Sequence, residues 1–247
     1  MASLAQEYNY PLTGSPTQFV TILALYLLFS LKWGPNIMKN QDAFSLRTLM
    51  AVYNLAQVVL NALLCARTVK VVANVGIVCS PLNSSDSATD IEIRNIHYYY
   101  FLTKMLDILD TIFLVLRKKN SQVSLLHMHH HVIMIVTPWA TFTYAPGGVL
   151  MWLVLFNTVV HVVMYFYYFL SLFDAAKAPW WKKYLTQLQI YQQVTMFVVF
   201  CIQFINWECT YPKILLVYCL SNTGLMIYLF CAFYVKNYIR KADSRTK

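Results

Sequence analysis

The sequence predicts an all-α polytopic membrane protein, and three observations lead to that prediction. First, 59% of the 247 residues are hydrophobic and only 12% are charged, whereas a soluble domain carries about 25% charged residues. Second, the apolar residues are gathered in runs of about 20 residues, the length that a helix needs to cross a bilayer. Third, Lys and Arg are concentrated between alternate runs, as in the cytoplasmic loops of membrane proteins. We therefore expect one compact transmembrane domain over residues 1–247, with no separate soluble domain.

Seven transmembrane helices are expected along the chain. Their approximate ranges are 17–33, 48–69, 97–116, 122–143, 149–171, 184–205 and 214–235, followed by a tail at 236–247. Gly34-Pro35 marks the expected end of the first helix, because Gly and Pro interrupt helices. Pro138 is expected to kink the fourth helix. The second range contains Asn54, Gln57, Asn61, Arg67 and Lys70, which suggests that this helix leaves the lipid early.

The distribution of basic residues orients these helices. With the N-terminus on the lumenal side, fourteen of the nineteen Lys and Arg fall in cytoplasmic segments, four fall on the opposite side, and Lys104 lies within the membrane. The basic C-terminal tail is then cytoplasmic. The net charge of +9 is therefore a topology signal that needs no nucleic acid to explain it, although a basic cytoplasmic rim also attracts phosphate-bearing substrates. No cleavable signal peptide is expected, because the first sixteen residues are polar and contain no Lys or Arg.

Two features of the predicted lumenal loops agree with this orientation. Asn83 begins the only N-x-[ST] sequon of the chain, in the loop between the second and third helices, where glycosylation occurs. Cys79 and Cys209 lie in two loops that the topology places on the same oxidising side. We predict a Cys79–Cys209 disulfide between these loops, and two free thiols are the alternative.

Polar and ionisable side chains lie inside the third and fourth ranges, where apolar ones are expected. At helical steps of three and four residues, Lys104, Asp107 and Thr111 share a face in the third range, with Asp110 next to Asp107. In the fourth range His127, His130 and His131 share a face, whereas His129 points away from the other histidines. A charge within a span costs roughly 2.5–3.5 kcal/mol on insertion scales, so such residues indicate a functional site.

The fifth and sixth ranges carry polar groups at a similar depth. The fifth presents one face with Asn157, His161, Tyr165 and Tyr168, and the sixth begins with a stripe of Thr186, Gln189 and Gln192. At 1.5 Å per residue, all four groups lie roughly 5–20 Å below the cytoplasmic surface. This common depth favours one site that opens toward the cytoplasm over a receptor or transporter, whose polar residues would open outward or extend across the membrane.

Several of these residues also have a purely structural explanation. Lys104 and Asp107 could form an internal ion pair, His161 could be a satisfied core histidine, and the tyrosines could form an interfacial belt. Three histidines on one face are harder to explain by packing, since each needs a buried partner. Their chemistry is either metal binding or acid–base and nucleophilic catalysis. The chain has six histidines, which are too few ligands for a dinuclear iron centre of the membrane type. A site for a single metal ion is not excluded by this count.

At these residues the chain resembles the very-long-chain fatty acid elongase (ELO) family over essentially its whole length. The family's KxxExxDT box is similar to Lys104, Asp107, Asp110 and Thr111, and its HxxHH box follows a basic connector as His127, His130 and His131. Its NxxxHxxMYxYY box resembles Asn157, His161, Met164, Tyr165, Tyr167 and Tyr168, and its TxxQxxQ box resembles Thr186, Gln189 and Gln192.

The resemblance implies a condensing enzyme of the endoplasmic reticulum membrane, a 3-oxoacyl-CoA synthase. Long-chain acyl-CoA and malonyl-CoA would give a 3-oxoacyl-CoA two carbons longer, with release of CoA and carbon dioxide. Spans two to seven would form a barrel around a substrate tunnel sealed at the lumenal end, with the first span outside it. The expected partners are the two CoA substrates and membrane lipid, and no metal or other cofactor is required. A homodimer and association with the other elongation-cycle enzymes are left open.

The resemblance also implies a role for each residue of the four boxes. His130 is the expected nucleophile of an acyl-histidine route, and His161 polarises the thioester or transfers a proton. His127 and His131 orient or bind substrate, while Asp107 and Asp110 hold imidazole tautomers and balance Lys104. Among the substrate-binding residues, the basic ones are expected to bind the CoA phosphates. The full expected set is Lys104, Thr111, Arg117, Lys118, Asn157, Tyr165, Tyr168, Lys182, Lys183, Thr186, Gln189 and Gln192, of which Arg117, Lys118, Lys182 and Lys183 are basic residues assigned to the phosphates.

Some residues depart from the family pattern. Asp107 stands where Glu is usual, which shortens the side chain by one methylene and puts a direct contact with a box histidine in question. Gln193 replaces a usual aromatic and changes the expected tunnel wall. The main alternative to a condensing enzyme is a metal-dependent membrane lipid desaturase or hydroxylase, which would contain stoichiometric iron.

Overall fold

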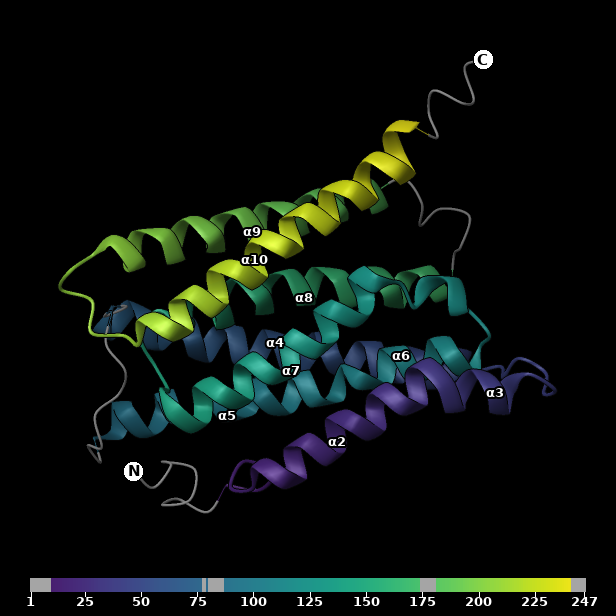
Figure 1. Ribbon diagram of the computed structural model, residues 1–247, viewed down its shortest axis with the longest axis horizontal. Helices are drawn as coiled ribbons and strands as arrows, with labels where there is room; N and C mark the ends of the chain where they lie inside the picture. Colours follow the sequence, from purple (N-terminus) through teal and green to yellow (C-terminus); the bar gives the residue numbers. More distant parts are fainter. Residues whose placement is uncertain (1–9, 77–78, 80–86, 174–180, 241–247) are drawn as a thin grey trace. The chain divides into compact units, whose positions relative to one another are not determined.

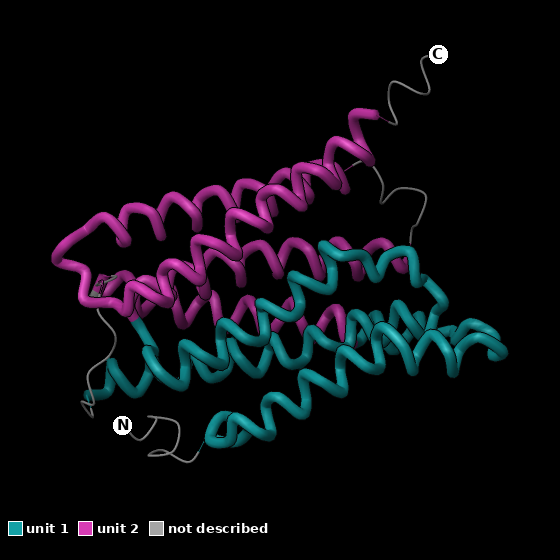
Figure 2. The backbone as a smooth tube through the Cα atoms, in the orientation of Figure 1, with its two compact units in different colours: residues 1–52, 82–147 teal, residues 53–81, 148–247 magenta. Residues whose placement is uncertain are grey.

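The computed structural model of the protein describes residues 10–76, 79, 87–173 and 181–240, and its regular elements are helices (Figure 1). The chain divides into two compact units (Figure 2). Unit 1 comprises residues 1–52 and 82–147, and unit 2 comprises residues 53–81 and 148–247. The single domain expected from the sequence stays a prediction.

The first helix of unit 1 is longer than expected. It begins with α2 (Pro16–Leu28), continues through the π-helical turn η1 (Phe29–Trp33) and ends with α3 (Gly34–Met38). The Ser15 side chain caps α2 by accepting the Gln18 backbone N–H at 3.4 Å. The helix continues to Met38, beyond the approximate end of the span expected at residue 33, because a π turn precedes Pro35 and the proline lies in the first turn of α3, where its missing N–H is tolerated.

The third expected span is two helices, α5 (Ala88–Leu106) and α6 (Ile108–Leu116), which meet at Asp107. The helix begins at Ala88, earlier than the span expected from about residue 97, because Ser87 caps it and accepts the Asp90 N–H at 3.1 Å. After the short 3-10 turn η2 (Asn120–Gln122), α7 (Leu125–Tyr144) contains Pro138 and continues past it.

The core of unit 1 joins its first helix to the later ones. α5 packs along α7, and Phe19 of α2 packs with Phe101 and Ile135 in one buried cluster. The ring of Phe19 also stacks on Trp139 of α7, with centroids 4.2 Å apart. The first helix is therefore held against the helices that carry the Lys104 and His127 groups.

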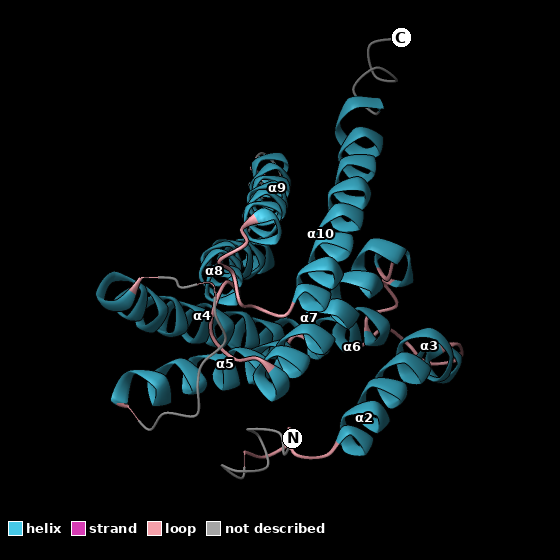
Figure 3. Ribbon diagram, turned by 60° about the vertical axis from the view of Figure 1, so that its left-hand side comes forward, coloured by secondary structure: helices cyan, strands magenta, loops and turns pink. Residues whose placement is uncertain are grey.

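Unit 2 contains most of α4 (Arg47–Val75), together with α8 (Leu150–Phe173), α9 (Lys182–Ile205) and α10 (Lys213–Tyr234), which continues into the π-helical turn η3 (Val235–Ile239). α9 packs along α10 and against α8. α4 continues to Val75, past the approximate span end at residue 69, and the last helix continues through η3 to Ile239, past residue 235. Among the described residues there is no strand (Figure 3).

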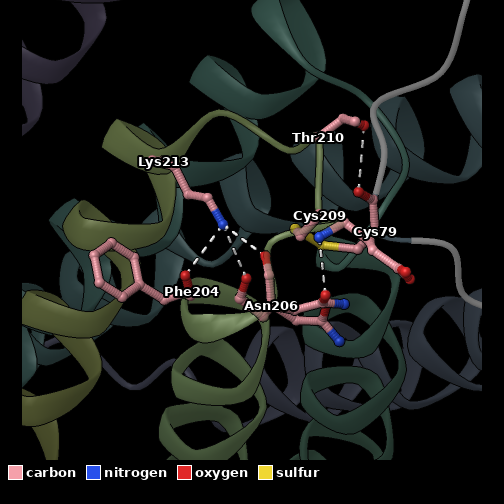
Figure 4. Close-up of a disulfide and its surroundings, with 8 residues drawn as sticks. Cys79, Phe204, Asn206, Cys209, Thr210 and Lys213 are labelled. Atoms are coloured by element: carbon pink, nitrogen blue, oxygen red, sulfur yellow. Dashed lines mark hydrogen bonds between the residues drawn. A yellow bond between two sulfur atoms is a disulfide. The ribbon is translucent and has the colours of Figure 1, made fainter.

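The predicted disulfide between Cys79 and Cys209 is confirmed and closes the α9–α10 end of unit 2 onto the segment after α4 (Figure 4). The Thr210 N–H donates to the Cys79 carbonyl at 3.0 Å. Lys213 donates to the carbonyls at the end of α9, including those of Phe204 at 3.1 Å and Asn206 at 3.0 Å. Next to the bridge, burial raises the pKa of the Tyr211 phenol well above its ordinary value. The glycosylation prediction at Asn83 lies outside the described residues.

Five helical segments are long and apolar enough to cross a membrane, so the chain has the character of a multi-pass membrane protein. These segments are Pro16–Met38, Arg47–Asn74, Leu150–Phe173, Lys182–Ile205 and Lys213–Ile239. The other two expected spans form helices, but polar and charged residues lower their hydropathy and Asp107 divides one of them. Seven spans, and a barrel made from six of them, stay predictions.

Candidate active site

The junction between α5 and α6 holds a buried charge pair. Lys104 Nζ lies 2.9 Å from Asp107 Oδ2, and the Lys104 side chain is 0% exposed. The ammonium also lies 5.2 Å from the centre of the Tyr100 ring. Asp107 caps the end of α5 and the start of α6, and its backbone N–H donates a hydrogen bond to the Thr103 carbonyl at 3.1 Å. Asp107 therefore lies at the break between the two helices and also neutralises the charge of Lys104.

One turn further, the box contacts a histidine through a hydroxyl. Thr111 Oγ1 lies 2.9 Å from His127 Nε2. On its other side, Thr111 Oγ1 lies 2.8 Å from the hydroxyl of Tyr26 on α2. Thr111 and Tyr26 are both buried. Among the sequence-predicted residues, the hydrogen-bond partner of this imidazole is thus Thr111, and Tyr26 is a member of the site that sequence reasoning missed.

The three histidines expected on one face of α7 are confirmed as neighbours. The rings of His127 and His131 have centroids 4.3 Å apart, and those of His130 and His131 have centroids 5.8 Å apart. Ser124 caps the helix just before them by accepting the His127 N–H at 3.3 Å. The cap fixes where the helix begins and so sets the three rings in the first two turns of α7.

On α8, in unit 2, the predicted face is also largely buried. Asn157, His161 and Tyr165 are buried, and Tyr168 lies at the edge with 37% exposure. The His161 and Tyr165 ring centroids are 5.6 Å apart, and those of Tyr165 and Tyr168 are 5.9 Å apart. Four residues at steps of four, four and three thus form one polar and aromatic row along the helix.

α4 supplies polar residues to the same row that were not predicted as site residues. Tyr53 OH lies 3.4 Å from Tyr165 OH, Gln57 donates to Tyr53 OH at 3.2 Å, and Asn61 donates to the Gln57 side-chain oxygen at 3.3 Å. Gln57 and Asn61 are buried. The spacing of four residues between these three side chains is the sequence feature from which this shared face could have been predicted. They mark a polar face that packs inward.

The stripe at the start of α9 is inward only in part. Thr186 and Gln192 are buried, and Thr186 Oγ1 lies 3.4 Å from the Tyr238 hydroxyl. Gln189 is half-buried and donates to Met164 Sδ of α8 at 3.4 Å. Gln193 is buried as well, so the residue that departs from the family pattern lies in the interior.

Residues 11–246 match the ELO family, which is described as the GNS1/SUR4 family. The chain belongs to the ELO family. Among its relatives, very long chain fatty acid elongase 4 of Mus musculus is 34% identical over 248 residues, covering 96% of this chain and 77% of the relative. Elongase 7 of Rattus norvegicus is 36% identical over 237 residues, covering 94% and 84%. Elongase 7 of Drosophila melanogaster is 35% identical over 243 residues, covering 97% and 74%.

In this ELO-family chain, the basic residues expected to bind phosphate lie in both units. In unit 1, Arg117 is half-buried with an NH group 3.3 Å from Met50 Sδ, and the exposed Lys118 donates to the Lys39 carbonyl at 3.3 Å. In unit 2, Lys182 and Lys183 are exposed. The Arg117 and Lys118 contacts tie the basic connector to the end of the first helix and the start of α4.

The ELO-family boxes are therefore divided between the units. Unit 1 brings together Lys104, Asp107, Thr111 and the histidines of α7, with Asp110 half-buried in the first turn of α6. Unit 2 brings together the α8 row, the α4 amides and the α9 stripe. Within the described ranges, no three or more His, Cys, Asp and Glu side chains are grouped so that they could hold a metal ion.

Proposed function

We propose that this ELO-family chain is the condensing enzyme of fatty acid elongation, acting in the endoplasmic reticulum membrane. It would join a long-chain acyl-CoA to malonyl-CoA and form a 3-oxoacyl-CoA two carbons longer, with release of CoA and carbon dioxide. The observation that carries the proposal is the histidine group of α7, in which His131 is buried and the ring centroids lie 4.3 and 5.8 Å apart. The relatives named very long chain fatty acid elongases support it.

In the first half-reaction, His130 is the nucleophile. A nitrogen lone pair of the neutral imidazole attacks the thioester carbonyl, the C–S bond breaks, and CoA leaves as the thiol after taking up a proton. The product is an acyl-imidazole, which is a reactive acyl donor. His127 and His131 orient the nucleophile or the substrate, and Asp107 and Asp110 balance the charge of Lys104.

In the second half-reaction, malonyl-CoA loses carbon dioxide and its α-carbon attacks the acyl group on His130. The new C–C bond forms as the C–N bond to the imidazole breaks, which regenerates His130. We assign His161 to polarising the thioester carbonyl, because negative charge develops there as the carboxylate leaves. Asn157, one turn away on α8, would orient His161.

The remaining predicted residues would bind the substrates. Arg117, Lys118, Lys182 and Lys183 are assigned to the CoA phosphates, because guanidinium and ammonium groups pair with phosphate. The N-terminus would be lumenal and the C-terminus cytoplasmic, so that CoA reaches the site from the cytosol. The amides of Gln189 and Gln192 and the hydroxyls of Thr186, Tyr165 and Tyr168 would line the polar end of the tunnel.

The test is incubation of the purified protein with long-chain acyl-CoA alone, followed by peptide mass spectrometry. We expect one acyl group on His130 with release of one CoA, and transfer of that group on addition of malonyl-CoA. His130→Ala should abolish both steps, whereas His129→Ala, a control on the same helix, should retain them. An acyl group on Cys or Ser, with an active His130→Ala, would overturn the nucleophile. Stoichiometric iron and an oxygen-dependent product would support the desaturase or hydroxylase alternative instead.

A further inference from the structure

The first helix reaches the histidine group through one side chain. Only Phe19 and Tyr26 of α2 are buried, and Phe19 serves packing, with its ring on Trp139. Tyr26 is 5% exposed and presents its hydroxyl to Thr111 Oγ1 at 2.8 Å and to Met128 Sδ at 3.9 Å. A phenol buried in this way, and aimed at a group of the candidate site, has a polar partner that packing alone does not require.

The three groups Tyr26, Thr111 and His127 form a hydrogen-bonded chain within unit 1. The Thr111 oxygen lies 2.8 Å from the phenol and 2.9 Å from His127 Nε2. A hydroxyl carries one proton and can accept on its lone pairs. The protons along the chain therefore run in one of two directions, and the direction decides whether His127 Nε2 accepts or donates.

The strengths of the donors and acceptors favour one direction. If Tyr26 donates to Thr111 and Thr111 donates to His127 Nε2, the chain runs from the phenol, its most acidic donor, to the imidazole nitrogen, its most basic acceptor. In the reverse direction the weaker imidazole N–H donates, and the phenol proton is left for the Ser30 hydroxyl or for the Met128 thioether, a weak acceptor. The first direction places the ring proton of neutral His127 on Nδ1.

We propose that Tyr26 is a positioning residue, which acts through Thr111 to hold His127 as the Nδ1–H tautomer. The proposal rests on the proposed condensing activity for its kinetic consequences, and it makes the first helix part of the working site. The family resemblance places the first span outside the barrel, and this role adds a residue of that span to the site. Without the phenol, Thr111 is free to donate to the carbonyl four residues earlier on its own helix, and His127 can then donate from Nε2.

Tyr26→Phe is the direct test, because it keeps the ring and removes the hydroxyl. We expect kcat to fall about tenfold, as for the loss of one buried hydrogen bond, with the KM for acyl-CoA unchanged within about twofold. Tyr10→Phe is the matched control, since the Tyr10 hydroxyl also makes a hydrogen bond in unit 1, to Asn95 Oδ1 at 2.9 Å. A control variant as slow as Tyr26→Phe would contradict the proposal.

A double-mutant cycle separates the hydrogen-bonded chain from a general effect on packing. Thr111→Val removes the middle hydroxyl, so adding Tyr26→Phe to it should lower kcat no further. Thr111→Ser keeps a hydroxyl and should retain most of the activity. Two losses that multiply in the double variant would overturn the proposal.

A readout without catalysis makes the proposal independent of the proposed function. Histidine labelled with ¹⁵N distinguishes the two tautomers by chemical shift, with His127→Gln to assign the signal. In the wild-type protein the His127 signal should be that of the Nδ1–H tautomer, and in Tyr26→Phe it should shift toward the other tautomer. If no condensation occurs but the tautomer shifts, the proposed function fails and the positioning role stands. If condensation occurs and the tautomer and kcat are unaffected, the positioning role fails alone.

Discussion

Lys104 Nζ and Asp107 Oδ2 lie 2.9 Å apart in a position where the side chains are 0% and 5% exposed. Removing one member of a buried ion pair leaves the other charge in a low-dielectric environment. We expect Asp107→Asn to lower the free energy of unfolding by about 3–5 kcal/mol and to abolish condensation. Thermal unfolding in detergent and the condensation assay measure the two effects separately.

Two further variants show which property of this pair matters. Asp107→Glu keeps the carboxylate and introduces the residue that is usual in the ELO family, so we expect it to retain most activity and stability. The double variant with Lys104→Met and Asp107→Leu removes both charges, and it should recover stability without recovering activity. A double variant that stays as unstable as Asp107→Asn would show that the pair is not the source of the instability.

Gly34 is required by the close approach of α3 to α6. A Cβ atom built on it would lie 2.7 Å from Val115 Cγ1 and 2.8 Å from the Phe29 carbonyl oxygen. We expect Gly34→Ala to lower the free energy of unfolding by about 1–3 kcal/mol through overpacking. Gly224→Ala in α10 is the control, because its Cβ would meet Phe197 at an ordinary 3.6 Å, and it should be neutral or stabilising. Equal destabilisation by both variants would argue against this explanation.

The Cys79–Cys209 disulfide closes a loop with a sequence separation of 130 residues. We expect Cys79→Ser to lower the free energy of unfolding by about 2–5 kcal/mol, mainly through the greater freedom of the unfolded chain. Reductant should destabilise the wild-type protein by the same amount and leave Cys79→Ser unaffected. Cys201 is a free, half-buried cysteine, so Cys201→Ser should keep the response to reductant. A wild-type melting curve that does not respond to reductant would refute this prediction.

The helices and the faces that they present are predictable from the sequence because these features depend on local spacing. Residues three and four apart lie on one helix face whatever surrounds them, so spacing alone groups His127, His130 and His131. The Cys79–Cys209 pairing follows from the compartment of each loop. The histidine grouping uses a short stretch of chain, whereas the pairing uses the topology expected for the whole chain; the structure contains the histidine group and the disulfide.

Helix ends and contacts between distant segments are less predictable. The hydrogen bond between Tyr26 and Thr111 joins residues 85 positions apart, and no local period points to it. The extra turn after Pro35 depends on a π turn, which sequence patterns do not show. The α4 amides suggest a short helix when only the sequence is considered, because burial of Gln57 and Asn61 depends on what packs against them. A hydrophobicity pattern indicates what lipid would favour, whereas these residues lie against protein.

His97 Nε2 accepts the backbone N–H of Gly147 at 3.1 Å, and both groups are buried. Gly147 and Gly148 have positive φ angles of 85° and 62°, so the turn needs glycine, and the histidine satisfies its buried N–H. We expect His97→Ala to lower the free energy of unfolding by about 1–3 kcal/mol, because the N–H loses its acceptor. Thermal unfolding measures this loss, and hydrogen exchange at Gly147 should accelerate. His97→Gln offers an acceptor oxygen and should recover part of the stability, while Ile91→Ala, at an exposed position of the same helix, should change little. A His97→Ala variant as stable as Ile91→Ala, with unchanged exchange at Gly147, would rule out this role for the histidine.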